Sequence, residues 1–255
     1  MLLAVDIGNT NTVLGLFDGE KLLSDWRLSS AITRTEDECW IVVKLFLENC
    51  GMKSGSISRV GISSVVPNLT EIFQLMARKY FNVEPLTINS DLDLGMKLHY
   101  DNPAAVGADR ICNAVAGFAK FGGPLIIIDF GTATTYDVVS KSGDYLGGVI
   151  APGIETAAAD LHRRAAKLPK IELRFPGNVI GTDTVSSMQS GILHGAVDSV
   201  EGMIRRIKGV LGQGAKVAVT GGHARLVHEH SHGIDYLEPS LVLHGIRLIY
   251  ERNQR

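Results

Sequence analysis

The sequence lacks the features that mark secreted, membrane-inserted or nucleic-acid-binding proteins. Its three cysteines, Cys39, Cys50 and Cys112, cannot all pair and are widely spaced, so we expect small buried thiols in a reducing compartment. The net charge of -2 offers no basic surface for nucleic acid. The opening MLLAVDIG has no basic segment and soon reaches an acid, so we expect neither a signal peptide nor a membrane span there. These absences predict a cytoplasmic protein without nucleic-acid or membrane partners.

Three common motifs for phosphate binding or hydrolysis are also missing. The chain has no G-x-x-x-x-G-K-[ST] sequence, which argues against a P-loop, and no G-x-S-x-G nucleophile elbow. The segment GQGAKV at 212–217 begins like a dinucleotide-binding fingerprint. It lacks the third glycine and precedes a predicted strand instead of following one, so a Rossmann site is unsupported.

Alternating strand-like and helix-like segments indicate an α/β protein. The length of 255 residues favours two domains, and the composition, 45% hydrophobic and 20% charged, is typical of globular chains. Strands are predicted over 2–8, 12–23, 24–30 and 59–66, with a turn at Asp18-Gly19. Helices are predicted over 36–50, 68–81 and 108–121, the second of them capped by Asn68 or Thr70.

A repeat relates the two halves of the chain. VDIGNTNTV at 5–13 and LIIIDFGTATT at 125–135 both place an aspartate at the end of an apolar run, then a glycine, then small hydroxyl or amide residues. Asp129 follows Asp6 by 123 positions. At the same offset, Gly131, Thr132, Thr134 and Thr135 match Gly8, Asn9, Asn11 and Thr12. The repeat predicts duplicated domains that face each other across a cleft.

The repeated turn has a purely structural and a functional interpretation. Glycine, asparagine and threonine are ordinary turn residues. In a duplicated hairpin, however, Gly8 and Gly131 can adopt positive φ and let the backbone approach a ligand, while N–H and hydroxyl groups face phosphate oxygens. Each strand-end aspartate can then hold a cation, which favours nucleotide binding. The strand-to-helix segment at 220–222 is either an ordinary turn or a place where Gly221 and Gly222 let an adenine or ribose lie against the backbone.

Six short motifs, in order along the chain, resemble those of the type III pantothenate kinases. They are DIGNTNT (6–12), GADR (107–110), DFGTATT (129–135), GGVIAPG (147–153), GTDT (181–184) and TGG (220–222). Each motif alone is weak, but the ordered set, which continues to LVLHGIRLIYERN near the C-terminus, is specific. The resemblance implies membership of the acetate and sugar kinase/Hsp70/actin superfamily, with two duplicated ribonuclease-H-like domains across a nucleotide cleft.

The resemblance also implies domains and an activity. The first domain would span 1–117 and carry the first phosphate loop and GADR. The second would span 118–255 and carry the second phosphate loop and the adenosine loop, and its C-terminal helix can pack on the first domain. The implied reaction is phosphorylation of pantothenate by ATP with Mg²⁺, the first step of coenzyme A biosynthesis. The implied enzyme is a homodimer that uses a monovalent cation, K⁺ or NH₄⁺.

Individual roles follow from the matched motifs. Asp6 would lie near the magnesium of the nucleotide, Asp129 would bind the monovalent cation, and Asp109 would be the catalytic base. The residues implied to contact ATP are Asp6, Ile7, Gly8, Asn9, Thr10, Asn11, Thr12, Val13, Thr132, Gly221 and Gly222. Those implied to contact pantothenate are Tyr100, Gly107, Ala108, Asp109, Arg110 and Thr184.

Several of these residues also have structural interpretations. Asp109 can cap the predicted helix over 108–121, or accept the proton of an attacking hydroxyl, and both roles can coexist. Arg110 suits the carboxylate of pantothenate but equally a surface acid. Tyr100 can be a core or turn aromatic, and Thr184 can cap a helix beginning near Val185. The histidines of HEHSH at 228–232 could chelate a metal, although such a tract is more often a solvated loop.

Two further expectations concern assembly and an alternative function. The apolar pattern of the helix predicted from 185 onward (Val185, Met188, Ile192, Leu193, Val197 and Val200) is broad enough for more than one packed face, which is consistent with a dimer, although such helices are often simply core. The alternative function is a nucleotide-binding transcription accessory protein without turnover. The intact GADR segment and both phosphate loops favour the enzyme.

Overall fold

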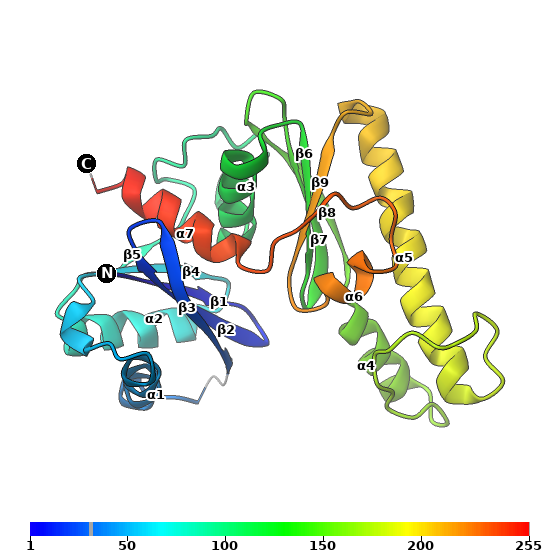
Figure 1. The fold of residues 1–255 in the computed structure, drawn as a ribbon, viewed down its shortest axis with the longest axis horizontal. Coiled ribbons are helices and arrows are strands. Elements are labelled where there is room, and N and C mark those ends of the chain that lie inside the picture. The colour runs from blue at the N-terminus through cyan, green and yellow to red at the C-terminus, as the bar shows by residue number, and fades with distance from the viewer. Residues whose placement is uncertain (31–32, 255) are drawn as a thin grey trace. The chain divides into compact units, whose positions relative to one another are not determined.

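The chain divides into two compact units, each built around one five-stranded mixed sheet (Figure 1). The computed structural model describes residues 1–30 and 33–254. The first unit comprises Met1–Ala116 and Leu241–Arg255, and the second comprises Gly117–Ser240, so the boundary falls within helix α3, Ala108–Phe121. Within the described residues, no helix is long and apolar enough to cross a membrane.

The first unit contains strands β1 to β5 and the C-terminal helix. Its elements are β1 (Leu2–Ile7), β2 (Asn11–Asp18), β3 (Lys21–Ser29), α1 (Glu36–Asn49), η1 (Ser54–Ser56), β4 (Arg59–Ser64), α2 (Pro67–Met76), the π-helical η2 (Ala77–Phe81), β5 (Leu86–Thr87), η3 (Pro103–Ala105) and α7 (Leu241–Arg252). The predicted helix starting at 68 begins at Pro67 instead, after the cap residue Val66. The capping prediction at Asn68 or Thr70 is therefore wrong. Pro67 can occupy the first helical position because the backbone N–H that proline lacks has no partner within a helix at that position.

The second unit contains strands β6 to β10. Its elements are β6 (Leu125–Phe130), β7 (Ala133–Val139), β8 (Tyr145–Pro152), α4 (Ile154–Arg164), α5 (Thr184–Leu211), β9 (Lys216–Thr220), α6 (Ala224–His228) and β10 (Tyr236–Leu237). Helix α5 begins after Asp183, whose carboxylate accepts the N–H of Ser186 at 2.9 Å. Asp183, and not Thr184, is therefore the cap.

The two sheets share one topology, as the repeat predicts. The strand orders are β3-β2-β1-β4-β5 and β8-β7-β6-β9-β10. In each, the first strand pairs antiparallel with the second and parallel with the fourth. Asp6 lies opposite Ser63 of the parallel neighbour, and Asp129 lies opposite Thr220. The shared strand order thus places one aspartate in each unit at the carboxyl end of a buried central strand.

The turn after the aspartate differs between the units. Ile7 pairs with Thr12, which leaves residues 8–11 in the first turn. Phe130 pairs with Thr134, which leaves only 131–133 in the second. Thr134 is thus the structural counterpart of Thr12, and both are buried. The constant offset expected across the repeat is therefore wrong beyond this turn, because the second loop is one residue shorter.

Glycines let helix α7 approach the sheet of the first unit closely. A Cβ added to Gly61 on β4 would lie 2.7 Å from Ile246 Cγ2, and one added to Gly15 on β2 would lie 2.8 Å from Leu243 Cδ1. A Cβ on Gly245 would overlap the carbonyl oxygen of Cys112. The backbone of α7 therefore packs directly against that of α3. The opposite face of the sheet is covered by α1 and α2.

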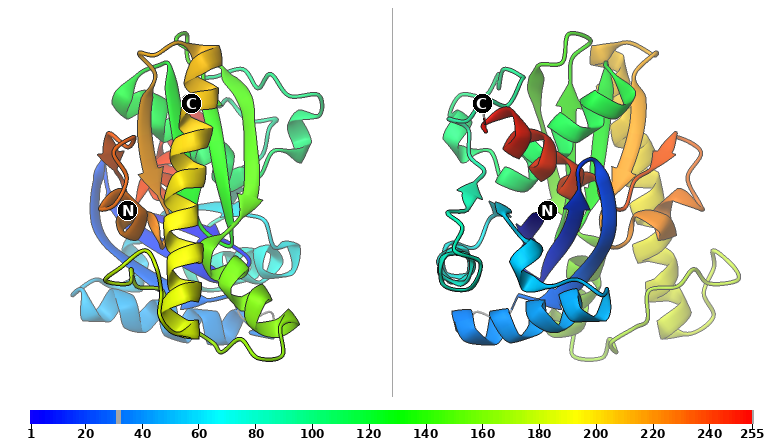
Figure 2. Two further views of the ribbon diagram at one scale, coloured as in Figure 1. Left: turned by 90° about the vertical axis from the view of Figure 1, so that its right-hand side faces the viewer. Right: turned by 60° about the vertical axis from the view of Figure 1, so that its left-hand side comes forward.

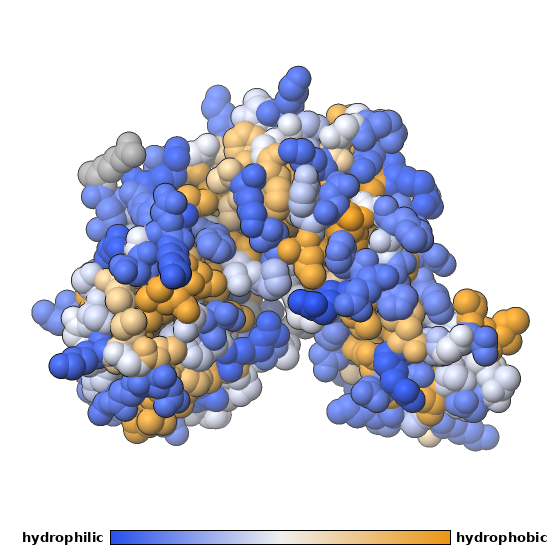
Figure 3. Space-filling model, in the orientation of Figure 1, coloured by the Kyte–Doolittle hydropathy of each residue, from blue (hydrophilic) through white to orange (hydrophobic). Residues whose placement is uncertain are grey.

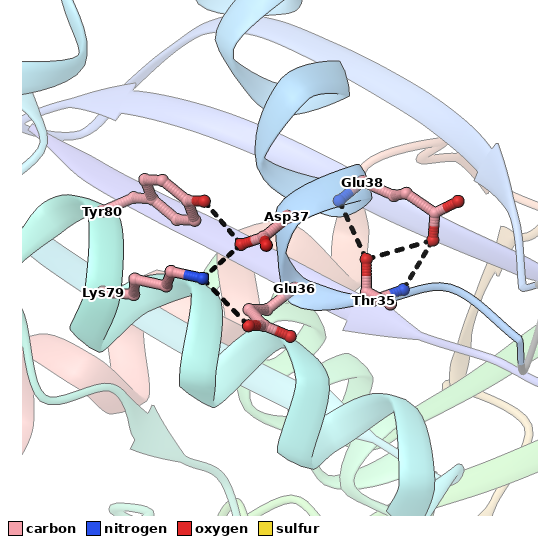
Figure 4. A network of polar contacts seen from close by, with 6 residues as sticks. All are labelled: Thr35, Glu36, Asp37, Glu38, Lys79 and Tyr80. Carbon is pink, nitrogen blue, oxygen red and sulfur yellow. Dashed lines mark hydrogen bonds and ion pairs between the residues drawn. The ribbon is translucent and has the colours of Figure 1, made fainter.

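Charged groups fasten the start of α1 to η2 (Figure 4). Lys79 Nζ lies 3.1 Å from Glu36 Oε1 and 2.5 Å from Asp37 Oδ1, and the hydroxyl of Tyr80 donates to the same Asp37 oxygen at 2.5 Å. Thr35 and Glu38 form a capping box at this end of the helix. The hydrogen bonds from Lys79 and Tyr80 hold the pKa of Asp37 below its usual value.

One face of the second sheet packs against the long helix α5, with α4 and α6 beside it (Figure 2). The buried residues of α5 are Met188, Gln189, Ser190, Leu193, Val197, Val200 and Ile204, whereas Val185 is exposed. On the other face, a Cβ added to Gly117 of α3 would lie 2.9 Å from Ile127 Cδ1. Close helix packing through a glycine thus occurs in this unit as well.

We predict that Gly245→Ala destabilises the protein by about 1–3 kcal/mol, because the added methyl group meets backbone atoms of Cys112 that cannot rotate away. Gly209→Ala is the control, since a Cβ there has no neighbour within 4 Å and alanine is the better helix former by about 1 kcal/mol. Urea unfolding of both variants would measure the difference. Equal stability of the two variants would contradict the close α3–α7 contact.

Candidate active site

The predicted first phosphate loop is held in place by hydrogen bonds from Ser30. The loop closes with a hydrogen bond from Gly8 N–H to the Asn11 carbonyl at 3.0 Å. Ser30 Oγ donates to the Gly8 carbonyl at 2.6 Å, and Ser30 N–H donates to the Thr10 carbonyl at 2.9 Å. With these carbonyls occupied, the exposed outer part of the loop is formed by Asn9 and Thr10.

The remaining residues of this loop are less accessible. Ile7 is fully buried in the core, so only its backbone is available to a ligand. Thr12 is also buried, and its hydroxyl lies 3.0 Å from that of Ser30. Neither Gly8 nor Gly131 has positive φ, which corrects that expectation. The turn closes with ordinary φ at Gly8, where a Cβ would lie a crowded 3.1 Å from the Asn11 carbonyl.

Asp6 lies at the end of β1 with one carboxylate oxygen already occupied. Ser63 of β4 is fully buried and donates its hydroxyl to Asp6 Oδ1 at 2.8 Å. Such a hydrogen bond to an ionised carboxylate is stronger than one between neutral groups and fixes the rotation of the carboxylate. The side chain of Asp6 is therefore presented in a defined orientation beside the loop.

Asp109 lies in the first turn of α3. The helix begins at Ala108, so Asp109 is inside the helix and is not its cap, which corrects that interpretation. Its Oδ1 accepts the N–H of Arg110 at 2.8 Å. A Cβ at Gly107 would overlap Asp109 Oδ1. The glycine of GADR therefore makes room for the carboxylate itself.

Burial changes the proton affinity of the groups at this end of α3. Desolvation raises the pKa of Asp109, and the N–H and positive charge of Arg110 oppose the shift in part. The thiol of Cys112, one turn further on, has a pKa raised well above its usual value by burial and then by the charges of Asp6 and Asp109, while a hydrogen bond with Ser63 opposes the rise. Both carboxylates thus act on one buried thiol.

Two other residues of the predicted substrate site, Tyr100 and Arg110, lie close to the start of α3 in the sequence. Arg110 is 7% exposed, so it is not the surface ion-pair residue that one alternative expected. Tyr100 is exposed, in the segment that leads to η3 and α3. It is not part of a core. A carboxylate, a buried guanidinium and an exposed phenol are thus all supplied by residues 100–110.

The predicted second phosphate loop is supported by hydrogen bonds from the start of α4. Its closing bond runs from Gly131 N–H to the Ala133 carbonyl at 3.0 Å. The Thr132 carbonyl accepts from Gly153 N–H at 3.1 Å and from Thr156 Oγ1 at 2.6 Å. Thr132 itself is exposed at the tip of the loop. The start of α4 therefore donates hydrogen bonds to a carbonyl of this loop, as Ser30 does to carbonyls of the first loop.

The TGG segment packs against Asp129. Gly221 has a φ of 95°, which favours glycine, and a Cβ there would overlap Asp129 Oδ1 and lie 2.6 Å from Phe130 N. The preceding Thr220 is buried, whereas Gly222 is exposed. Glycine at position 221 therefore allows the backbone to lie directly against Asp129.

Thr184 lines a separate pocket of about 550 Å³ within the second unit. The lining residues are Leu168, Gly181, Thr182, Asp183, Thr184, Ser187 and Met188. Thr184 is exposed at the first helical position of α5. Two apolar side chains just before it, Val179 and Ile180, are 67% and 83% exposed.

Sequence reasoning missed Ser30, Ser63, Cys112 and Thr156. Ser30 and Thr156 are far from the loops in sequence, and nothing in their local pattern marks them. Ser63 does leave a signal, because it is a hydroxyl residue at the end of the apolar strand RVGISS. A buried hydroxyl requires a hydrogen-bond partner, which here is Asp6.

The HEHSH segment has structural roles. His228 ends α6, and His230 stacks on Phe175 with ring centroids 3.5 Å apart. His232 N–H donates to Glu201. Across the described part of the chain, no group of three or more His, Cys, Asp or Glu side chains is arranged to hold a metal.

Comparisons with known proteins identify the family of this chain. The sequence model of the type III pantothenate kinase family matches residues 2–206. A type III pantothenate kinase of Exiguobacterium sp. is 47% identical over 255 residues, which cover all of both chains. Two solved structures share the fold. They are (R)-2-hydroxyglutaryl-CoA dehydratase component A of Acidaminococcus fermentans (TM-score 0.58, 15% identity, 100% and 99% covered) and a ROK hexokinase of Thermus thermophilus (TM-score 0.53, 15% identity, 100% and 99% covered). The chain therefore belongs to the type III pantothenate kinase family.

Proposed function

We propose that this protein transfers the γ-phosphate of ATP to pantothenate, which forms 4′-phosphopantothenate and opens coenzyme A biosynthesis. The observation that carries the proposal is the half-buried carboxylate of Asp109 in the first turn of α3, which accepts the N–H of Arg110 at 2.8 Å and lies in the same unit as Asp6. Phosphoryl transfer needs alignment, charge screening and an acceptor for the proton of the attacking hydroxyl. Asp109 is the acceptor in this proposal.

The first loop and Asp6 are proposed to hold the phosphates of Mg²⁺-ATP. Asp6 fits a magnesium role because Mg²⁺ prefers oxygen ligands and usually binds one or two carboxylates together with phosphates and water. A single oriented carboxylate suits that pattern better than a cage of protein ligands. The metal would screen the phosphate charge, while Asn9, Thr10 and the backbone through Val13 position the oxygens.

The second unit is proposed to supply Asp129 for a monovalent cation, Thr132 for the nucleotide, and Gly221 and Gly222 for its adenosine. Carboxylate and carbonyl oxygens coordinate K⁺ and accept hydrogen bonds from NH₄⁺, and Asp129 offers a carboxylate. Gly221 already brings the backbone against Asp129. The two groups of this unit would therefore act together.

Pantothenate is proposed to bind through Tyr100, Gly107 to Arg110, and Thr184. The guanidinium of Arg110 can form paired hydrogen bonds with the pantothenate carboxylate. Burial of Arg110 strengthens such an interaction because fewer waters compete for it. Thr184 would contribute a hydroxyl from the GTDT pocket.

We further propose that the enzyme is a cytoplasmic homodimer. Support for the dimer comes from apolar groups left exposed around Thr184, namely Val179, Ile180 and Val185. Apolar patches also interrupt the polar surface in Figure 3. The cytoplasm is supported by Cys39, Cys50 and Cys112, all of which carry free thiols. A transcription accessory role without turnover is not favoured, because the GADR carboxylate and both loops are intact.

Replacement of the proposed base tests the function. Asp109→Asn should lower turnover by about 10²–10⁴, the usual contribution of a general base, while nucleotide binding is retained. In the wild type, kcat/KM should fall with decreasing pH at a pH above 3.8, the usual aspartate value, because burial raises the pKa of Asp109. The measurement is a coupled ATP–pantothenate assay across pH.

Stability supplies the control for that variant. The raised pKa means that the folded state keeps the Asp109 proton to a higher pH than the unfolded chain does, so this group's contribution to stability declines as pH rises above 3.8. At pH 7 the neutral Asp109→Asn protein should therefore melt at or above the wild-type temperature. Near wild-type turnover in a folded Asp109→Asn protein would overturn the assignment of the base.

Asp129→Ala should abolish stimulation by K⁺ or NH₄⁺ and raise KM for ATP, since the carboxylate that balances the cation is lost. Asp144→Ala, in the turn between β7 and β8, is the matched control and should retain both properties. Steady-state rates with and without each cation would be compared. Unchanged cation stimulation in Asp129→Ala would place that site elsewhere.

The dimer can be tested with one charge on the exposed patch. Ile180→Asp should shift sedimentation toward monomer and raise KM for pantothenate, because a buried charge opposes association. Val210→Asp is the control, since Val210 is also an exposed apolar residue but lies at the far end of α5, a helix about 40 Å long, and this variant should sediment as wild type. A wild-type protein that sediments as a fully active monomer would contradict the proposed dimer.

A further inference from the structure

We infer that Ser63 is a positioning residue for phosphoryl transfer, which holds the Asp6 carboxylate in the rotation that binds the nucleotide's metal. The inference rests on the proposed function and assigns a role to a residue outside the matched motifs. Ser63 acts through Asp6 and does not itself contact ATP or pantothenate.

Strand register brings the two side chains together. In the parallel pair β1–β4, Asp6 lies opposite Ser63, and side chains at paired positions project from the same face of a sheet. The distance from Ser63 Oγ to Asp6 Oδ1 is 2.8 Å. Because both atoms belong to central strands of the sheet, neither side chain can drift with a loop.

Burial protects the hydrogen bond between Ser63 and Asp6 from competition by water. Ser63 is 0% exposed, so water does not compete for its hydroxyl. An orphaned hydroxyl in this position would cost free energy, which makes Asp6 the obligatory acceptor. The hydrogen bond to Oδ1 restricts the rotation of the Asp6 carboxylate, as in other sites where an outer hydrogen bond orients a carboxylate ligand.

Cys112 connects this pair to the helix that carries the proposed base. Its thiol interacts with Ser63 and feels the charges of Asp6 and Asp109. While the Ser63 hydroxyl donates to Asp6, its oxygen is left to accept from the thiol. The position of α3 is fixed in turn by the direct contact of Gly245 with Cys112. Ser63 therefore interacts both with Asp6 and with the helix that carries Asp109.

The second unit provides an independent parallel. Asp129 occupies the position equivalent to Asp6, and its register partner on the parallel strand β9 is Thr220, a buried hydroxyl residue. A hydroxyl thus faces the strand-end aspartate in both sheets, although the loops that follow differ in length. The parallel also indicates that threonine is compatible with this position.

The test compares ATP binding with and without metal. Isothermal titration would measure binding of Mg²⁺-ATP, and of ATP in excess EDTA, to the wild type, Ser63→Ala and Ser63→Thr. Ser63→Ala should weaken Mg²⁺-ATP binding by about 10–100-fold, the usual effect of removing an outer hydrogen bond from a metal ligand. It should leave metal-free ATP binding unchanged. Ser63→Thr, which keeps the hydroxyl, should recover most of the loss.

Ser24→Ala is the matched control. Ser24 lies on β3 of the same sheet, and its hydroxyl is 3.2 Å from Cys50 Sγ and unconnected to Asp6. It should bind both forms of ATP as the wild type does, whatever its melting temperature. Wild-type Mg²⁺-ATP affinity in Ser63→Ala, or an equal loss with and without metal, would overturn the inference. Absence of pantothenate turnover in the wild type would instead count against the proposed function.

Discussion

The structure depends on one constraint, which is that a carboxylate must lie at the end of a buried central strand. Asp6 and Asp129 each follow a run of fully buried residues on the strand that pairs with two neighbours. A charge in that position is tolerated only with polar partners. Ser63 serves Asp6, and the backbone at Gly221 packs against Asp129. The rest of each unit holds these partners in register.

The two units share one strand order but differ in the residues that hold the loop after each aspartate. Both sheets have the same strand order, yet the first loop is tied to Ser30 at the end of a strand region and the second to Gly153 and Thr156 at the start of α4. The second loop is also shorter by one residue. Equivalent strands with different loop supports suit two loops that are proposed to hold different cations.

Much of this could be predicted from sequence because it depends on local pattern. The apolar runs that end at Asp6 and Asp129, and the repeat between them, indicated the α/β architecture and both loops. The positive φ at Gly8, the cap at Asp109 and the uniform repeat offset were wrong. Each depends on how the backbone closes a turn, which residue types alone do not determine. Ser30 and Thr156 were invisible for a further reason, since their partners are distant in sequence.

The account's central claim is that this chain phosphorylates pantothenate. The most direct measurement incubates the purified protein with Mg²⁺, K⁺, ATP and pantothenate, and identifies the products by mass spectrometry and phosphorus NMR. The account predicts one 4′-phosphopantothenate for each ADP formed. ADP accompanied by free phosphate, or ATP bound without any phosphorylated pantothenate, would contradict it.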